Sequence, residues 1–125
     1  MVNEIIHFEI PAKNPAKLSE FYKKSFGWAF KDSGMKGMKY WMIQTEKKPK
    51  VGGGMYKKDN PKQGPVNYYN TANIDASITK VKKNGGKIVV PKAEIPGMGF
   101  SAVALDPEGN MVGLFQPTSR RPARK

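Results

Sequence analysis

The chain has 125 residues, with 22 lysines and arginines, 10 acidic residues, one histidine and no cysteine. This length suits a single domain, and the composition excludes disulfide scaffolds, zinc–thiolate sites, cysteine nucleophiles and any site that needs two imidazoles from one chain. The net charge of +12 at pH 7 favours anionic or neutral ligands over cationic ones.

The first predicted elements are a strand and a helix. The apolar run 5–10 indicates a strand that Pro11 ends. Asn14 is a good N-cap, Pro15 suits the first helical position and Gly27 is a natural stop, so we expect a helix between them. Its apolar residues recur at i, i+3, i+4 and i+8 and form one stripe: Leu18, Phe21, Tyr22 and Phe26.

Three strand-like segments follow, at residues 28–30, 39–45 and 51–56. The third carries glycines at 52–54, which indicate either a bulge or backbone that another group approaches closely. The polar segment 57–65 contains two prolines and is predicted to be a linker.

The same order of elements then repeats in the second half of the chain. Asn73 opens a predicted helix that ends before Gly85, just as Asn14 opens the first one 59 positions earlier. Pro91 and Pro117 are expected to end strands, and Asp106–Asn110 is a strong turn signal. The predicted strands cover 66–71, 87–90, 100–105 and 111–116.

This repeat predicts an α+β fold of two βαβββ modules, one at about 1–58 and the other at about 65–117. Together they form one predicted domain, 1–117, followed by a basic tail, 118–125. We expect the modules to build a curved, U-shaped mixed sheet with both helices outside, whose concave face is a natural ligand pocket.

His7 and Glu9 are the candidate catalytic pair. They lie two positions apart on the first predicted strand, so their side chains share a face. A carboxylate beside an imidazole orients it and raises its pKa, which would make a base that needs no metal. The alternative is a structural histidine that is hydrogen-bonded to a neighbour on the concave face.

Aromatic residues on the predicted strands are candidates for lining the pocket. The alternative role for strand aromatics is packing in the core or in a dimer contact. The candidate ligand-binding residues are Tyr40, Trp41, Tyr56, Tyr68, Phe100 and Phe115.

The order of these motifs resembles the vicinal oxygen chelate superfamily, which includes glyoxalase I, extradiol dioxygenases and the fosfomycin- and bleomycin-resistance proteins. The similarity covers about residues 4–117, and the turn before the last strand is its best single mark. The segments that carry it are His7–Pro11, Phe21–Tyr22, Phe26–Trp28, Asn84–Gly86, Pro96–Gly99 and Asp106–Asn110.

The resemblance implies a metal site built from a histidine on the first strand of a module and a carboxylate on its last. His7 matches the first of these positions. The other three fall at Val66–Asn67, at Gly113 and within Gly52–Gly54, where no such ligand is present. One imidazole supplies too few donors for a divalent ion. We therefore expect a degenerate site with no metal or other cofactor.

The resemblance implies a glyoxalase-like protein that binds a small neutral or anionic molecule in the concave sheet. Whether it is a lyase, an oxidoreductase or no enzyme is left open. One alternative is a metal-dependent lyase, isomerase or dioxygenase that uses His7 with carboxylates. Another is a protein that sequesters a drug or antibiotic, although a +12 chain is a poor match for cationic drugs.

The expected partners are a small molecule and, as in many superfamily members, a second copy of the chain in a homodimer. No recognisable reader of nucleic acid is present, so the basic tail predicts at most non-specific attraction. No apolar run approaches the length of a membrane span, and Met1–Ile6 lacks the pattern of a targeting segment. We expect a cytoplasmic protein.

Overall fold

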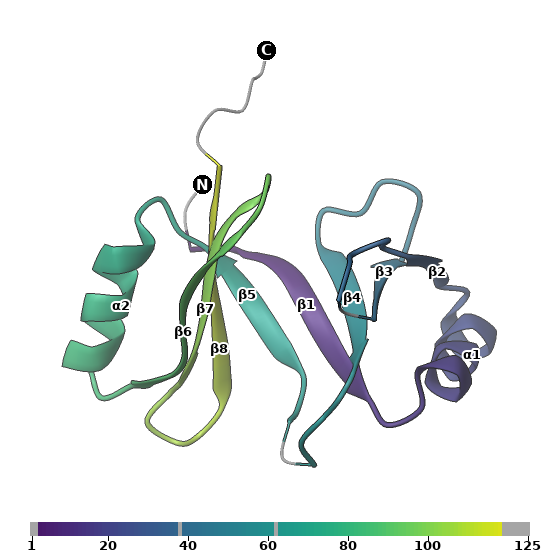
Figure 1. Cartoon of the computed structure of the whole chain (residues 1–125), viewed down its shortest axis with the longest axis horizontal. Coiled ribbons are helices and arrows are strands. Elements are labelled where there is room, and N and C mark those ends of the chain that lie inside the picture. Colours follow the sequence, from purple (N-terminus) through teal and green to yellow (C-terminus); the bar gives the residue numbers. More distant parts are fainter. Residues whose placement is uncertain (1–2, 38, 62, 119–125) are drawn as a thin grey trace. The chain divides into compact units, whose positions relative to one another are not determined.

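The computed structural model describes residues 3–37, 39–61 and 63–118. Within them the chain folds into eight strands and two helices, arranged as two βαβββ modules (Figure 1). The predicted α+β class is therefore confirmed. The structure divides into an N-terminal unit, Ile6–Val66, and a C-terminal unit that joins Met1–Ile5 to Asn67–Lys125. Each unit contains one module.

The N-terminal unit places its four strands in the order β2-β3-β4-β1. β1 and β4 run parallel, and the other neighbours are antiparallel. The helix crosses over between β1 and β2, so the first and last strands of the module come side by side. The elements are β1 (Ile5–Ala12), α1 (Pro15–Phe26), β2 (Ala29–Asp32), β3 (Tyr40–Gln44) and β4 (Gly52–Lys57).

The C-terminal unit repeats this topology with the order β5-β8-β7-β6. Here β5 and β8 run parallel, and β8, β7 and β6 are joined by antiparallel pairs. The elements are β5 (Val66–Asn70), α2 (Ile74–Lys83), β6 (Lys87–Ile95), β7 (Gly99–Leu105) and β8 (Met111–Pro117).

The start and end of α1 follow the predicted signals. The Asn14 side chain accepts a hydrogen bond from the Lys17 backbone N–H at 3.1 Å, which satisfies one of the unpaired donors of the first turn. Gly27 adopts φ 74°, the left-handed conformation that glycine reaches without strain, and its N–H bonds the Lys23 carbonyl. Leu18 and Tyr22 of the predicted apolar stripe pack on the core, whereas Phe21 and Phe26 are 54% and 61% exposed. The buried cluster is Ala12, Ile43 and Met55, with Phe8, Ile10, Trp28 and Phe30 also packed against it.

The second helix packs in the same way. Asn73 caps it by accepting from the Ala76 N–H at 3.1 Å, and Gln116 Oε1 on β8 accepts from the Ile74 N–H at 2.8 Å. The second bond ties the start of α2 to the sheet through a side chain. The core beneath it contains Ile74, Ala102 and Leu114, with Ile78, Val81, Phe100 and Val112 packed around them.

Three strand ends predicted from proline are wrong. β1 continues through Pro11 to Ala12, β6 continues through Pro91 to Ile95, and β8 includes Pro117. Proline removes one backbone donor, and this is tolerated where the neighbouring strand does not need that donor. Pro91 lies on β6, the last strand in the order of its unit, within the shift of register between Val90 and Ala93 in the ladder with β7.

Two further predictions concern the C-terminal tail and membrane-spanning helices. The basic tail lies outside the described residues from position 119 onward. No helix in the described ranges is long and apolar enough to span a membrane.

Two methionines on neighbouring strands give a matched test of the N-terminal core. Met55 is 0% exposed beneath α1, whereas Met42 is 40% exposed on the other face of the sheet. We predict that Met55→Ala lowers the free energy of unfolding by about 2–5 kcal/mol, because it leaves a cavity. Met42→Ala should change it by about 0.5 kcal/mol or less. Urea denaturation of both variants measures the difference, and equal losses would contradict this description of the core.

Candidate functional site

The two faces of the N-terminal sheet have different roles, as the strand register shows. Phe8 pairs with Gly53, and both lie on the face that packs against α1. His7 and Glu9 therefore project from the opposite face, because neighbours in a strand point to opposite sides. Tyr40 joins them on this face from β3. The prediction that His7 and Glu9 share a face is consistent with this arrangement.

Tyr40 connects the two predicted residues. The Tyr40 hydroxyl donates to Glu9 Oε2 at 2.9 Å and lies 2.8 Å from His7 Nε2. Tyr40 is only 7% exposed, whereas His7 and Glu9 are partly buried. We call these three residues the His7–Tyr40–Glu9 cluster. The sequence predicted Tyr40 as a ligand contact and did not indicate its bridging role.

The glycines of β4 make room for this bridge. Gly54 lies opposite Glu9 in the register, and a Cβ placed there would collide with the hydroxyl and ring of Tyr40. A Cβ at Gly52 would sit 3.4 Å from His7 Nδ1. Of the two explanations offered for these glycines, close approach is correct here, since the β1–β4 ladder runs through them without a shift.

The hydrogen bonds also fix the tautomer of His7. A tyrosine hydroxyl has one proton, and Tyr40 gives it to Glu9, so His7 Nε2 must be the donor to Tyr40. The basic lone pair of the neutral ring then lies on Nδ1. Burial lowers the pKa of His7 below its ordinary value of 6.5. The expected rise in the His7 pKa is wrong, because burial sets the direction of the shift.

Tyr56 adds a second tyrosine to the same face. It lies opposite Tyr40 on β4 and opposite Pro11 on β1. Burial raises the pKa of Tyr56, and the negative charges of Glu9 and Asp59 raise it further. Tyr56 is therefore a neutral hydroxyl at physiological pH, able to donate or accept a hydrogen bond.

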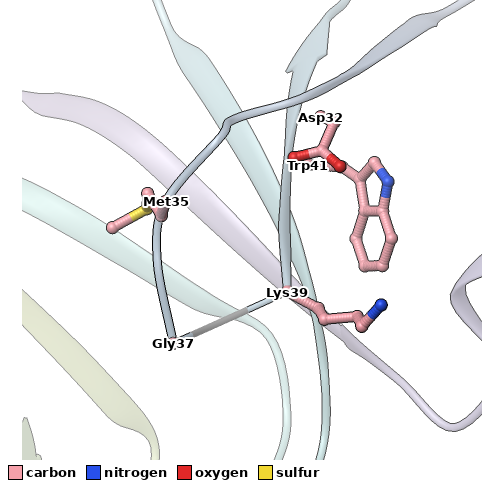
Figure 2. A pocket seen from close by; sticks show the side chains of 5 residues that line it. All are labelled: Asp32, Met35, Gly37, Lys39 and Trp41. Carbon is pink, nitrogen blue, oxygen red and sulfur yellow. The ribbon is translucent and has the colours of Figure 1, made fainter.

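Trp41 lies apart from the cluster. It pairs with Met55, whose side chain is in the core beneath α1, and it lines a pocket of about 430 Å³ with Asp32, Met35 and Lys39. Figure 2 shows the Trp41 and Lys39 side chains extending to the same side, with the Asp32 carboxylate next to Trp41. The structure does not bring Trp41 together with His7.

The remaining aromatic candidates belong to the C-terminal unit and lie on different faces. The Tyr68 ring covers Gly113, so a side chain at Gly113 would collide with it. Phe115 pairs with Ser101 on β7 and lies on the same face as Tyr68. Phe100 instead packs with the core beneath α2, where the Lys92 ammonium lies 4.8 Å from its ring centre.

The residues of the cluster do not fit the metal that the resemblance implies. Gly52 and Gly54 supply no side-chain donor, and Tyr40 fills the space into which a β4 side chain would project. His7 Nε2 and Glu9 Oε2 are both bonded to the Tyr40 hydroxyl rather than converging on a common point. In the described parts of the chain, no three histidine, aspartate or glutamate side chains gather in a way that could hold a metal ion.

The close approach of Tyr40 to Gly54 gives a sharp test. We predict that Gly54→Ala lowers the free energy of unfolding by about 1–3 kcal/mol, because the new methyl group displaces the Tyr40 ring. Gly64→Ala is the control, since a Cβ there meets nothing within 4 Å. In a Tyr40→Leu background, which lacks the ring tip and hydroxyl, Gly54→Ala should cost clearly less. A Gly54→Ala loss no larger than that of Gly64→Ala would contradict the packing.

The lowered pKa of His7 predicts how stability depends on pH. The unfolded chain takes up a proton at His7 more readily than the folded chain, so stability falls as pH drops from 6.5 through the folded pKa. NMR titration of this single histidine should give a midpoint below 6.5. Urea denaturation across that window should show a slope that disappears in His7→Gln. The Asp106 pKa is also lowered, but from 3.8, so Asp106 titrates at more acidic pH. A His7 midpoint at or above 6.5 would contradict the prediction.

Solved structures with the same fold include epimerases and a dioxygenase. A methylmalonyl-CoA epimerase from Mycobacterium tuberculosis matches with a TM-score of 0.70 and 13% identity, over 94% of this chain and 89% of its own. A Streptomyces coelicolor methylmalonyl-CoA epimerase in complex with 2-nitronate-propionyl-CoA matches with a TM-score of 0.66 and 13% identity, over 95% and 100%. A 2,3-dioxygenase from Pseudomonas sp. KL28 gives 0.58 and 13%, over 98% of this chain and 45% of the dioxygenase. At these identities the likeness shows a shared fold alone.

The sequence itself identifies the family. No curated protein matches the chain significantly. The profile of one superfamily, however, matches residues 4–114, which is nearly the whole of both modules. This agrees with the paired βαβββ topology and with the resemblance found in the motifs. The chain belongs to the Glyoxalase/Bleomycin resistance protein/Dioxygenase superfamily.

Proposed function

We propose that this protein binds a small neutral or anionic molecule against the His7–Tyr40–Glu9 cluster and moves a proton to or from it without a metal ion. The observation that carries the proposal is the state of His7. The ring is partly buried, which lowers its pKa and favours the neutral form, and the bond to Tyr40 leaves Nδ1 as the basic atom. Neutral imidazole with a fixed orientation is the usual form of a general base.

Glu9 and Tyr40 support this role as positioning residues. The Glu9 carboxylate fixes the direction of the Tyr40 proton, and Tyr40 in turn fixes the His7 tautomer. Gly52 presents no side chain to the ring, and a Cβ there would sit 3.4 Å from Nδ1. After His7 accepts a proton, Tyr40 and Glu9 stabilise the resulting positive ring through the same hydrogen bonds.

The substrate class follows from charge and from the fold neighbours. A chain of net charge +12 attracts anions. Two of the structures that share its fold are named as epimerases, and an epimerase inverts one stereocentre. Removal and return of a proton is the simplest route to inversion where a carbonyl group acidifies the carbon. The proposed substrate is therefore a small carbonyl compound with an acidic C–H bond and a negative charge.

A non-catalytic binding protein is the second candidate. The hydrogen bonds among His7, Tyr40 and Glu9 favour this candidate, because a purely structural polar cluster would show the same bonds. In that case the face would hold its ligand without chemistry, as a sequestering protein does. We place either form of the protein in the cytoplasm as a homodimer. This rests on the cysteine-free sequence and the superfamily resemblance.

Proton exchange in D₂O tests the proposal directly. We predict that the purified protein speeds deuterium incorporation next to the carbonyl of methylmalonyl-CoA or of a small anionic 1,3-dicarbonyl compound, followed by mass spectrometry. His7→Gln should slow the exchange by about 10²-fold or more, as expected for loss of a general base. Lys82→Gln on the exposed surface of α2 is the control and should leave the rate unchanged. EDTA should also have no effect.

The other outcomes decide between the candidates. Exchange that EDTA abolishes would overturn the metal-free mechanism. Binding of these compounds near His7 by NMR, without exchange in any variant, would overturn the proton transfer and support the binding protein. No binding and no exchange would overturn both.

A further inference from the structure

We propose that a hollow where β1 meets α1 binds a small amphipathic anion, namely a carboxylate or phosphate monoester attached to one apolar group. The hollow has a volume of about 450 Å³, within the range typical of small-molecule sites. We call it the α1 pocket, and the residues that carry the argument are Pro11, Lys13, Lys17, Leu18, Phe21 and Lys58. None of them belongs to the His7–Tyr40–Glu9 cluster.

The apolar part of the α1 pocket comes from β1 and the first two turns of α1. Pro11 is buried and Leu18 is partly buried against the core, so they form a fixed wall. Phe21 is 54% exposed, although it packs edge-on against Tyr22 with ring centres 5.1 Å apart. Exposed apolar surface of this kind is unfavourable in water, and a hydrocarbon or aromatic group placed against Phe21 would cover it.

All charged residues that line the α1 pocket are positive. Lys13, Lys17 and Lys58 line the pocket, and no acidic residue does. Within the described ranges the ion pairs are Lys23–Glu20 and Lys92–Asp75, so none of the three lysines has a carboxylate partner there. Lysines of like charge around one hollow give it a positive potential, which an anion bound there would offset.

Most of the backbone donors at the start of α1 are already bonded or absent. Asn14 Oδ1 accepts from the Lys17 N–H and the Asn14 carbonyl accepts from the Leu18 N–H, while Pro15 has no N–H. The attraction for an anion therefore comes from flexible lysine side chains. The electrostatic part of the affinity should therefore weaken as the salt concentration rises. The remaining binding free energy must come from an apolar group on the ligand.

Octanoate, octanol and octylammonium form a probe series that separates charge from apolar contact. We predict that octanoate shifts the backbone NMR signals of the α1 pocket at low salt. Octanol should bind about tenfold more weakly and octylammonium more weakly still. The variant Lys13→Gln/Lys17→Gln/Lys58→Gln should lower octanoate affinity by about tenfold. Phe21→Ala should lower it too, whereas His7→Gln should leave it unchanged.

A matched control tests whether position matters or only total charge. Lys80→Gln/Lys82→Gln/Lys83→Gln removes three charges from the last turn of α2 and should leave octanoate affinity nearly unchanged. Equal losses in the two triple variants would overturn the proposal in favour of general attraction by a basic chain. Octanoate signals that move elsewhere, or binding to anionic phospholipid vesicles without binding to monomeric octanoate, would also overturn it.

Discussion

The hydroxyl of Tyr40 is the group on which the candidate site depends. It stands between His7 and Glu9, sets the direction of both hydrogen bonds and leaves the basic lone pair of the neutral imidazole on Nδ1, while burial lowers the pKa of His7. It can do so only because Gly54 has no side chain in that space. One absent Cβ on β4 therefore determines where a tyrosine from β3 can lie, and with it the tautomer of a histidine on β1.

The donor atoms of this cluster do not fit the metal site that the superfamily resemblance implies. A metal site needs several donors that converge on one point and are free to bind. Here the donors of β1 are bridged by a proton-carrying hydroxyl, and the facing strand contributes glycines. The C-terminal unit shows a related pattern, since the Tyr68 ring covers Gly113 of β8. In both modules an aromatic ring fills the space beside a glycine of the last strand.

Local signals in the sequence predicted most of the fold. Asn14, Asn73 and Gly27 mark helix ends through their own backbone and side-chain preferences, so they can be interpreted without knowing the rest of the chain. The bridge through Tyr40 could not be found this way. Tyr40 is 33 positions from His7, and its position follows from the register of β3 against β4 and of β4 against β1. The glycines of β4 were the one available signal of the bridge. They indicated that another group approaches the β4 backbone closely, but not that this group is Tyr40.

Pro91 of β6 has a consequence for the association of this protein with other copies of itself. β6 ends the strand order of its unit and carries Val89 and Val90, which are 40% and 48% exposed. An open strand rich in valine is a template for unwanted pairing with another chain. Pro91 follows directly and lacks the donor that such pairing requires, while the irregular register bends the strand out of a flat geometry. The residue that was expected to end the strand thus removes one backbone donor from an edge strand, a change that disfavours pairing with another chain.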